Sequence, residues 1–318
     1  MSGLTNVTGL EVRVFAVEMV YVPQGEYNIA KGFYVIPSNC CGSNGFNGLF
    51  NAPGNNFPVI NTRLTPSLSY SDGTTATIRI KGDAGIDTNN DGVVDNTIYP
   101  TGYKAFYSYK YEMSEQQYAD FLNTLNATQI TTIGVAGSSI TLTNGQYFSS
   151  TPNKACGNSN ANRLFAYADW SGLRPMTILE FNKASYGPLQ PVYNGSCCPI
   201  MNGYSAGGVN SNPNGFSGNI SANRILRDVG FSASAGTNRG QSGASYYGIM
   251  DFTLNATEPV VKLNYFNFTT QNGNGVLGST GVTDISSWIA TGMLMFIDQW
   301  EQQYGSGSYG FRYVRSAE

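Results

Sequence analysis

The stretch "DTNNDGVVD", residues 87–95, has residue types and spacing that suit a bound cation. Carboxylate and amide side chains stand at alternate positions, and Gly92 falls where such a loop needs a sharp turn. Hard oxygen ligands of this kind bind calcium in proteins, and one backbone carbonyl adds to the set. The predicted calcium ligands are Asp87, Asn89, Asp91, Val93 through its carbonyl, and Asp95.

The end of this loop departs from the usual calcium pattern, because Ile98 stands where a bidentate Glu is common. The site then resembles the shorter calcium loops of extracellular proteins, or it takes a further ligand, for which Asp83 is the nearest candidate. The alternative is a solvated turn, since Asp, Asn and Gly are also common turn residues. We expect calcium, because the oxygen side chains and the Gly fall in register.

The composition excludes several other chemistries. His is absent, which removes the commonest general base, imidazole metal ligands and every Ser-His or Cys-His pair. We therefore expect no serine or zinc hydrolase site and no haem, and no motif indicates a nucleotide. The net charge is −3 and the 17 Lys and Arg form no basic run, so no nucleic-acid partner is expected.

The cysteines leave the redox environment open. In an oxidising compartment the two adjacent pairs could cross-link distant loops, whereas in a reducing one they would be small buried hydrophobes. The five cysteines are Cys40, Cys41, Cys156, Cys197 and Cys198. No apolar run approaches the ~20 residues of a membrane span, and no signal peptide is visible, so we expect no membrane span.

Hydrophobic periodicity predicts the elements that must position these residues. Alternating apolar residues predict strands over 10–22 and 75–82, and the C-terminal "YGFRYVRSA" predicts a closing strand. Segments rich in Gly, Asn and Ser predict long irregular loops at about 37–75 and 202–246.

Three helices are predicted from their caps and apolar faces. The first begins at Ser114, whose side chain forms a capping box with Gln117. The second covers about 161–170, and the third begins at Thr177, capped against Glu180. About three helices with short strands and long loops indicate an α+β fold.

Five segments, taken together and in order, resemble the formylglycine-generating enzyme (sulfatase-modifying factor) domains. The resemblance implies a C-type-lectin-like fold and one domain over 1–318, with loop insertions at about 37–75 and 202–246. The segments are "VEMVYVPQGEY" (17–27), "YKAFYSYKYEMSEQQYADFLNTL" (103–125), "FAYADWSGLRPMTILEFNKAS" (165–185), "GIMDFTLNATEP" (248–259) and "GFRYVR" (310–315).

The segment "GLRPMTILEFNKAS" (172–185) is the most enzyme-like of these in appearance. Its Thr177 cap, its apolar face, and Arg174, which can span to a carboxylate in a bidentate pair, are all explained by maintenance of the fold. We interpret it as scaffold rather than as a catalytic segment.

The chemistry of the resembled family requires a late pair of cysteines that hold copper, because thiolates are the soft ligands that this metal needs. No cysteine follows Cys198, and "WIATGMLMFIDQW" (288–300) occupies the neighbourhood of that pair. We therefore expect no copper site and no enzyme. Family members also bind calcium near the segment that contains Asn255 and Glu258, although ordinary turn hydrogen bonding explains those two residues as well.

These observations predict a non-enzymatic structural or adhesion protein of a cell, extracellular or particle surface, within a larger extracellular or virion-type assembly. Its partners would be other copies of itself or other assembly subunits. The alternative is a calcium-assisted module that binds a surface glycan or receptor through aromatic residues such as Tyr246 and Tyr247. The third hypothesis is a surviving copper-dependent formylglycine-generating oxidase.

Overall fold

The computed structural model of the chain describes its framework and leaves several long segments undescribed. For the short strands within 58–70 and 294–297 only the backbone is described. The described residues are 14–28, 58–60, 68–70, 98–158, 160–188, 245–250, 256, 258–261, 268–288, 294–297 and 310–317. The strand predicted at 75–82 lies outside them, as does nearly all of the loop predicted at 202–246.

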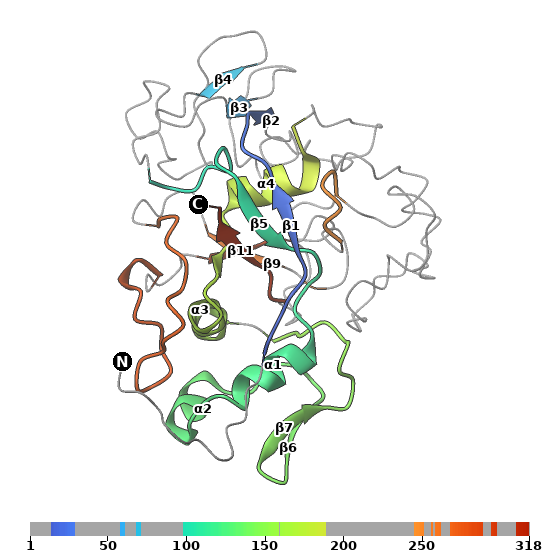
Figure 1. The fold of residues 1–318 in the computed structure, drawn as a ribbon, viewed down its shortest axis with the longest axis vertical. Helices are drawn as coiled ribbons and strands as arrows, with labels where there is room; N and C mark the ends of the chain where they lie inside the picture. Colours follow the sequence, from blue (N-terminus) through green and yellow to red (C-terminus); the bar gives the residue numbers. More distant parts are fainter. Residues whose placement is uncertain are drawn as a thin grey trace, which may run out of the picture.

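A four-stranded antiparallel sheet lies at the centre of the fold, with strand order β1-β5-β11-β8 (Figure 1). It brings together segments from the two ends and the middle of the chain. The strands are β1 Met19–Val22, β5 Phe106–Tyr109, β8 Arg174–Pro175 and β11 Tyr313–Ser316, the last of which confirms the predicted closing strand.

The β1 strand is shorter than the predicted strand over 10–22. It begins at Met19, which pairs with Tyr109 at the end of β5. One further backbone bond, from the Lys110 N–H to the Glu18 carbonyl at 3.0 Å, closes the ladder. The described residues before Glu18 follow no neighbouring strand, so their alternating pattern produces no ladder.

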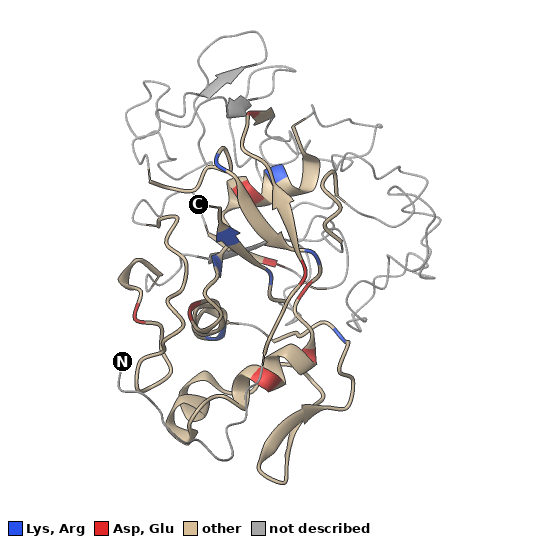
Figure 2. Cartoon of the chain, viewed as in Figure 1, with Lys and Arg blue, Asp and Glu red and all other residues tan. Residues whose placement is uncertain are grey.

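Charged residues are sparse on the described framework. Figure 2 shows them scattered singly over helices and strands, without a run of either sign. This agrees with the low charge of the whole chain, in which 12% of residues are Asp, Glu, Lys or Arg. The described surface therefore offers polar and aromatic contacts more than an electrostatic field.

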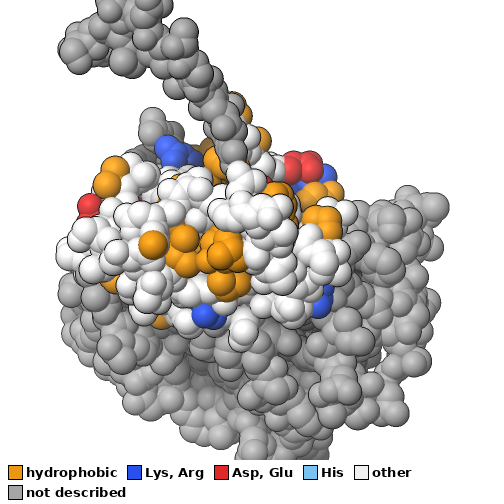
Figure 3. Space-filling model, turned by 90° about the horizontal axis from the view of Figure 1, so that it is seen from below, with side chains coloured by type: hydrophobic (Ala, Val, Ile, Leu, Met, Phe, Trp, Pro, Cys, Tyr) orange, Lys and Arg blue, Asp and Glu red, His pale blue; other side chains and the backbone are white. Residues whose placement is uncertain are grey.

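Two helices and a hairpin form the end of the molecule that Figure 3 views. The helices are α1 Glu115–Leu122 and α2 Ala127–Ile133. The capping box predicted for α1 is confirmed: Ser114 accepts the Gln117 N–H, and the Gln117 side chain returns to the Ser114 N–H at 2.9 Å. The α2 helix was not predicted, although "NATQ" carries the same kind of box with Asn as the cap.

The hairpin was also not predicted. It pairs β6 Ile140–Thr143 with β7 Gln146–Ser149, and its turn is Asn144-Gly145, with φ of 51° and 79°. Positive φ at both turn residues is the requirement of the two-residue turn that matches strand twist, and Asn-Gly meets it with little strain. The signal was therefore present in the sequence.

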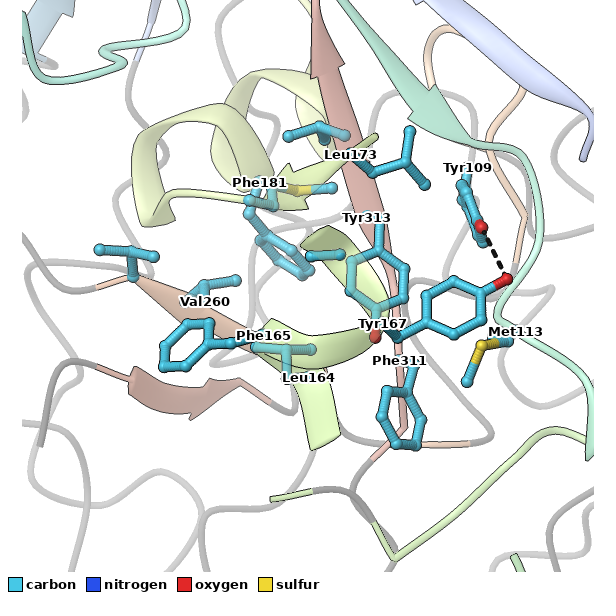
Figure 4. Packing of buried hydrophobic residues seen from close by; sticks show 14 of the residues in the cluster. Tyr109, Met113, Leu164, Phe165, Tyr167, Leu173, Phe181, Val260, Phe311 and Tyr313 are labelled. Carbon is cyan, nitrogen blue, oxygen red and sulfur yellow. Dashed lines mark hydrogen bonds between the residues drawn. The ribbon is translucent and has the colours of Figure 1, made fainter. Parts of the chain in front are cut away.

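An aromatic cluster fills the space between the central sheet and α3, Ala161–Trp170, whose predicted bounds are confirmed (Figure 4). Tyr167 of α3 stacks on Tyr313 of β11 with ring centroids 5.1 Å apart, and Tyr109 of β5 meets Tyr313 edge-on at 5.5 Å. Such ring pairs contribute beyond the area that they bury. Tyrosines thus join the sheet to the helix.

The third predicted helix is α4, Ile178–Tyr186, which begins after the Thr177 cap as expected. Every residue of α4 is buried, including the polar ones. The Tyr27 hydroxyl binds the carbonyl oxygens of Thr101 and Leu179, at 2.7 and 3.0 Å, so the start of the chain and the 98–105 segment pack onto this helix. A helix buried on all sides needs internal partners for its charges.

Short strands complete the described structure. β2 Tyr27–Asn28, β3 Pro58–Ile60 and β4 Leu68–Tyr70 form a three-stranded sheet, and β9 Glu258–Val261 pairs with β10 Leu294–Ile297. The long loop insertion predicted at about 37–75 thus contains β3 and β4 among its described residues. A short 3-10 helix, Ser286–Trp288, buries Trp288.

The fold is α+β, with four α-helices and small antiparallel sheets among the described residues, against about three helices predicted. The single domain over 1–318 stays a prediction. In the part of the chain that the structure describes, none of the helices has the length and apolarity to cross a membrane.

Candidate functional site

A buried ion pair lies at the start of α4, in the most enzyme-like segment of the sequence. Arg174 donates from Nη1 to Glu180 Oε2 at 2.7 Å and from Nη2 to Oε1 at 2.5 Å. Both side chains are almost fully buried, at 1% and 2% exposure. This bidentate geometry is the strongest form of such a pair, and it confirms that Arg174 spans to a carboxylate.

The same two side chains hold several elements together. Glu180 Oε2 also accepts the Thr177 N–H at 3.1 Å, and Arg174 Nε donates to Ser316 Oγ of β11 at 2.8 Å. The Thr177 hydroxyl donates to the Pro100 carbonyl at 2.7 Å. The pair thus joins β8, α4, β11 and the 98–105 segment, and its charged groups are occupied by internal partners.

A buried lysine lies one turn further along α4. Lys183 Nζ donates to three backbone carbonyls: Pro23 at 2.6 Å, Gly102 at 2.7 Å and Gly25 at 3.1 Å. Burial lowers the pKa of Lys183 to about 8, and the nearby Glu180 carboxylate opposes that shift. The lysine therefore fastens the turn after β1 and the 98–105 segment to α4.

Two buried tyrosines, Tyr27 and Tyr99, lie near Glu180. Burial, and next the Glu180 carboxylate, raise the pKa of both Tyr27 and Tyr99 well above the ordinary value. Both phenols therefore stay protonated and donate hydrogen bonds, that of Tyr99 to the Val261 carbonyl of β9 at 3.1 Å. They serve as donors and not as bases.

A small pocket of about 140 Å³ opens beside the Arg174–Glu180 pair. Its polar groups can form hydrogen bonds, but Arg174 and Glu180 already bind each other, and the lining has neither Cys nor His. The pocket has polar groups and room for a small polar molecule or water. It is lined by residues 98–105 and by Arg174, Glu180, Thr270, Ser316 and Ala317.

A second buried ion pair involves Glu258, one of the two residues with a possible calcium contact. Arg312 Nε donates to Glu258 Oε1 at 3.0 Å, and Arg312 Nη2 donates to the Met250 carbonyl at 2.8 Å. The Glu258 carboxylate thus has an internal partner in Arg312. This agrees with the alternative to a calcium contact, in which ordinary hydrogen bonding explains the residue. Asn255 lies outside the described residues.

The predicted calcium ligands Asp87, Asn89, Asp91, Val93 and Asp95, together with Asp83, lie outside the described residues, so the calcium loop stays a prediction. Within the described residues, no group of three or more Cys, Asp or Glu side chains is placed to hold a metal ion.

Cys156 is the cysteine that lies among the described residues. Cys156 is buried, its Sγ lies 3.8 Å from the Gly157 carbonyl, and burial together with Glu115 raises its pKa well above the ordinary value. A protonated, buried thiol is a poor metal ligand. The two adjacent pairs of cysteines lie outside the described residues, and residues 199–318 contain no cysteine.

Sequence reasoning did not anticipate the buried carboxylate of Asp169, in the last turn of α3. It accepts hydrogen bonds from the Thr283 hydroxyl at 2.6 Å and from the Asn274 N–H at 3.0 Å. The Asp284 N–H lies 3.3 Å from the same carboxylate. Asp169 thereby holds the described 268–288 segment against α3. An acidic residue near a helix C-terminus, where the dipole disfavours it, was the available signal.

The tyrosines proposed for glycan contact are partly buried. The rings of Tyr246 and Tyr247 meet edge-on at 4.9 Å. Tyr246 packs against Gly187 so closely that a Cβ there would lie 2.3 Å from the ring, and Gly187 has a φ of 73°. Only glycine fits that position easily. The pair therefore packs on the end of α4, and its relation to the calcium loop stays untested.

Comparisons with known proteins establish no family for this chain. No protein-family model matches it, and no curated protein matches it. Among solved structures, that of PvdO from Pseudomonas aeruginosa aligns with 95% of this chain and 95% of its own, with 14% identity and a TM-score of 0.40.

We predict that Glu180→Leu lowers the free energy of unfolding by about 3–5 kcal/mol, because it leaves the Arg174 charge buried without a partner. The double variant Arg174→Met/Glu180→Leu should recover much of that loss, since it removes both charges. Urea denaturation measures both. The exposed Lys110–Glu18 pair is the control, and Glu18→Gln should cost less than about 1 kcal/mol. Equal losses for Glu180→Leu and Glu18→Gln would contradict the role of the buried pair.

The pKa of Lys183, lowered to about 8 from an ordinary value of 10.5, makes the stability of the fold depend on pH. Between these values the unfolded chain holds the proton and the folded chain does not, so this group adds stability as pH rises from 8 to 10.5. The stability of the wild type relative to Lys183→Met should rise over that range, by at most about 1.4 kcal/mol per pH unit. Lys104→Met, on an exposed lysine, is the control, and parallel curves for wild type and Lys183→Met would refute the assignment.

Proposed function

We propose that this chain is a non-enzymatic structural or adhesion protein of a cell, extracellular or particle surface, built on a scaffold of the formylglycine-generating-enzyme type with a C-type-lectin-like fold. The observation that carries the proposal is the missing thiolate pair. Residues 199–318 contain no cysteine, and Cys156 is buried with a raised pKa. The resembled oxidation needs two thiolates on copper late in the chain.

The distribution of the resembling segments supports the scaffold part of the proposal. The segments 17–27, 103–125, 165–185 and 310–315 contain β1, β5, β8 and most of β11 of the central sheet, together with α1 and most of α3 and α4. They therefore coincide with the structural framework.

Exposed aromatic residues on the central sheet support the proposal that this chain binds other proteins. Tyr21 and Tyr107 form a cross-strand pair on the central sheet, with ring centroids 5.2 Å apart and exposed fractions of 51% and 39%. Arg315 lies next to Tyr107 on β11. Tyrosine and arginine are enriched where proteins bind one another, because each combines apolar area with hydrogen bonding. The proposed partners are other copies of the chain or other subunits of an assembly.

A calcium-assisted module for a surface glycan or receptor is the second candidate. The exposed Tyr21–Tyr107 pair favours it, because flat aromatic faces also stack on the apolar faces of sugars. A glycan array with and without a chelator separates the two candidates. Chelator-sensitive binding to a defined glycan would favour the second.

The absence of the family's oxidase activity is tested directly. Incubated with copper, oxygen, a reductant and a cysteine-containing sulfatase-motif peptide, the chain should produce no aldehyde, measured as the mass change of the peptide. An authentic formylglycine-generating enzyme in the same mixture is the positive control. Aldehyde formed in proportion to this chain would overturn the non-enzymatic assignment.

The calcium proposal predicts that calcium binds the wild-type chain and raises its melting temperature. Asp91→Ala should weaken that binding at least tenfold, because it removes a central carboxylate of the loop. Asn90→Ala is the matched control, since that position is not a ligand in the predicted pattern. Titration calorimetry measures both, and equal affinities for the two variants would show that 87–95 is only a solvated turn.

A further inference from the structure

The two edges of the β6–β7 hairpin differ in how their backbone groups are satisfied. The outer edge of β7 is covered by side chains of α1 and the residue that follows it. Asn123 accepts the Tyr147 N–H at 2.7 Å and donates to the Tyr147 carbonyl at 2.9 Å, and Gln116 accepts the Ser149 N–H at 3.3 Å. These contacts close that edge to other strands.

The outer edge of β6 has no such cover. In a two-residue hairpin the closing pair, here Thr143 with Gln146, exchanges both hydrogen bonds, and every second pair along the ladder does the same. Ile140 and Leu142 belong to the other pairs, so their N–H and C=O groups point away from β7. Within the part of the chain that the structure describes, these groups have no hydrogen-bond partner.

This free edge also lacks the features that normally protect one. Residues 138–151, "SSITLTNGQYFSST", contain no charge and no proline. Leu142 is 59% exposed and Phe148 is 47% exposed. Figure 3, which views this end of the molecule, shows apolar side chains gathered near its middle and charged ones toward its rim. Natural proteins place lysines, prolines or bulges on strand edges that must stay unpaired.

The hairpin is held in place on α1 before any partner arrives. The Glu115 carboxylate is buried and accepts the Ser138 N–H at 2.9 Å, the Ser149 hydroxyl at 2.7 Å and the Thr151 hydroxyl at 3.1 Å. Glu115 thereby ties β7 and the residues that flank the hairpin on both sides to the start of α1. A fixed edge loses little conformational entropy when another strand pairs with it.

We propose that the β6 edge pairs with the β6 edge of a second copy of this chain, antiparallel and about a two-fold axis at Thr141. Ile140 would exchange two backbone hydrogen bonds with Leu142 of the partner subunit, and Leu142 would do the same with the partner's Ile140. An antiparallel edge is complementary to itself under this symmetry. The two hairpins then form one four-stranded sheet. This inference deepens the proposed assembly function and rests on it.

The chemistry of the edge favours a second copy over an unrelated partner. The strand carries no charge that would select a partner of opposite sign, and in this register the exposed Leu142 lies opposite Ile140 of the partner subunit, so apolar side chains meet on both sides of the axis. A four-residue edge is a small contact, so we expect reversible association that increases with protein concentration rather than an obligate dimer.

Charge variants at Thr141 test the pairing, because this residue meets its own copy at the axis. The single variants Thr141→Arg and Thr141→Asp each place like charges directly opposite one another, which disfavours pairing. Each should have half the mass of the wild type in sedimentation equilibrium of the full chain. An equimolar mixture of the two should recover the wild-type mass, because opposite charges then meet.

Gln146→Arg, an exposed position on the covered strand, is the matched control and should keep the wild-type mass. Circular dichroism and thermal unfolding check that every variant is folded. A wild type that stays monomeric, a Thr141→Arg variant of unchanged mass, or a mixture that fails to reassociate would each overturn the proposal. Aldehyde formation in the peptide assay would overturn the non-enzymatic function and leave these masses unaffected.

Discussion

The framework depends on the buried bidentate pair between Arg174 and Glu180. Two charges removed from water cost several kcal/mol each, and only good geometry with further hydrogen bonds offsets that cost. Here the Thr177 N–H, the Ser316 hydroxyl and the Pro175 carbonyl supply those bonds. The pair therefore fixes where β8, α4 and β11 meet. A side chain so fully engaged is not free to act on a substrate.

Local signals in the sequence were sufficient for the helices and for the Arg174–carboxylate pair. The capping boxes at Ser114 and Thr177 depend on residues three positions apart, so a short window contains the whole motif. The Asn144-Gly145 turn and the Asn126 cap are equally local signals, although no hairpin or helix was predicted from them. The partners of Lys183 lie 81 to 160 residues away, and no local pattern encodes them.

For the strands, tertiary packing decides where each strand begins and which of its aromatic residues are buried. The alternating pattern over 10–22 continues beyond the point where a partner strand exists, so β1 starts only at Met19. The aromatic residues of β5 and β11 become core because Tyr167 of α3 stacks on Tyr313 across the sheet. Tyr21 and Tyr107 have similar sequence character and stay exposed, because α3 does not reach that end of the sheet. Exposure of an aromatic residue is a tertiary property.

The described buried charges are engaged within the fold, and the function proposed for the chain lies in contacts made at its surface, of which pairing at the uncovered β6 edge is the most specific. Amide hydrogen exchange of the wild-type chain at low and high protein concentration tests this most directly. If the β6 edges pair, the peptide containing Ile140 and Leu142 gains protection as concentration rises, while the peptide containing Tyr147, already bonded to Asn123, does not change. Exchange at Ile140 and Leu142 that is independent of concentration would contradict this pairing.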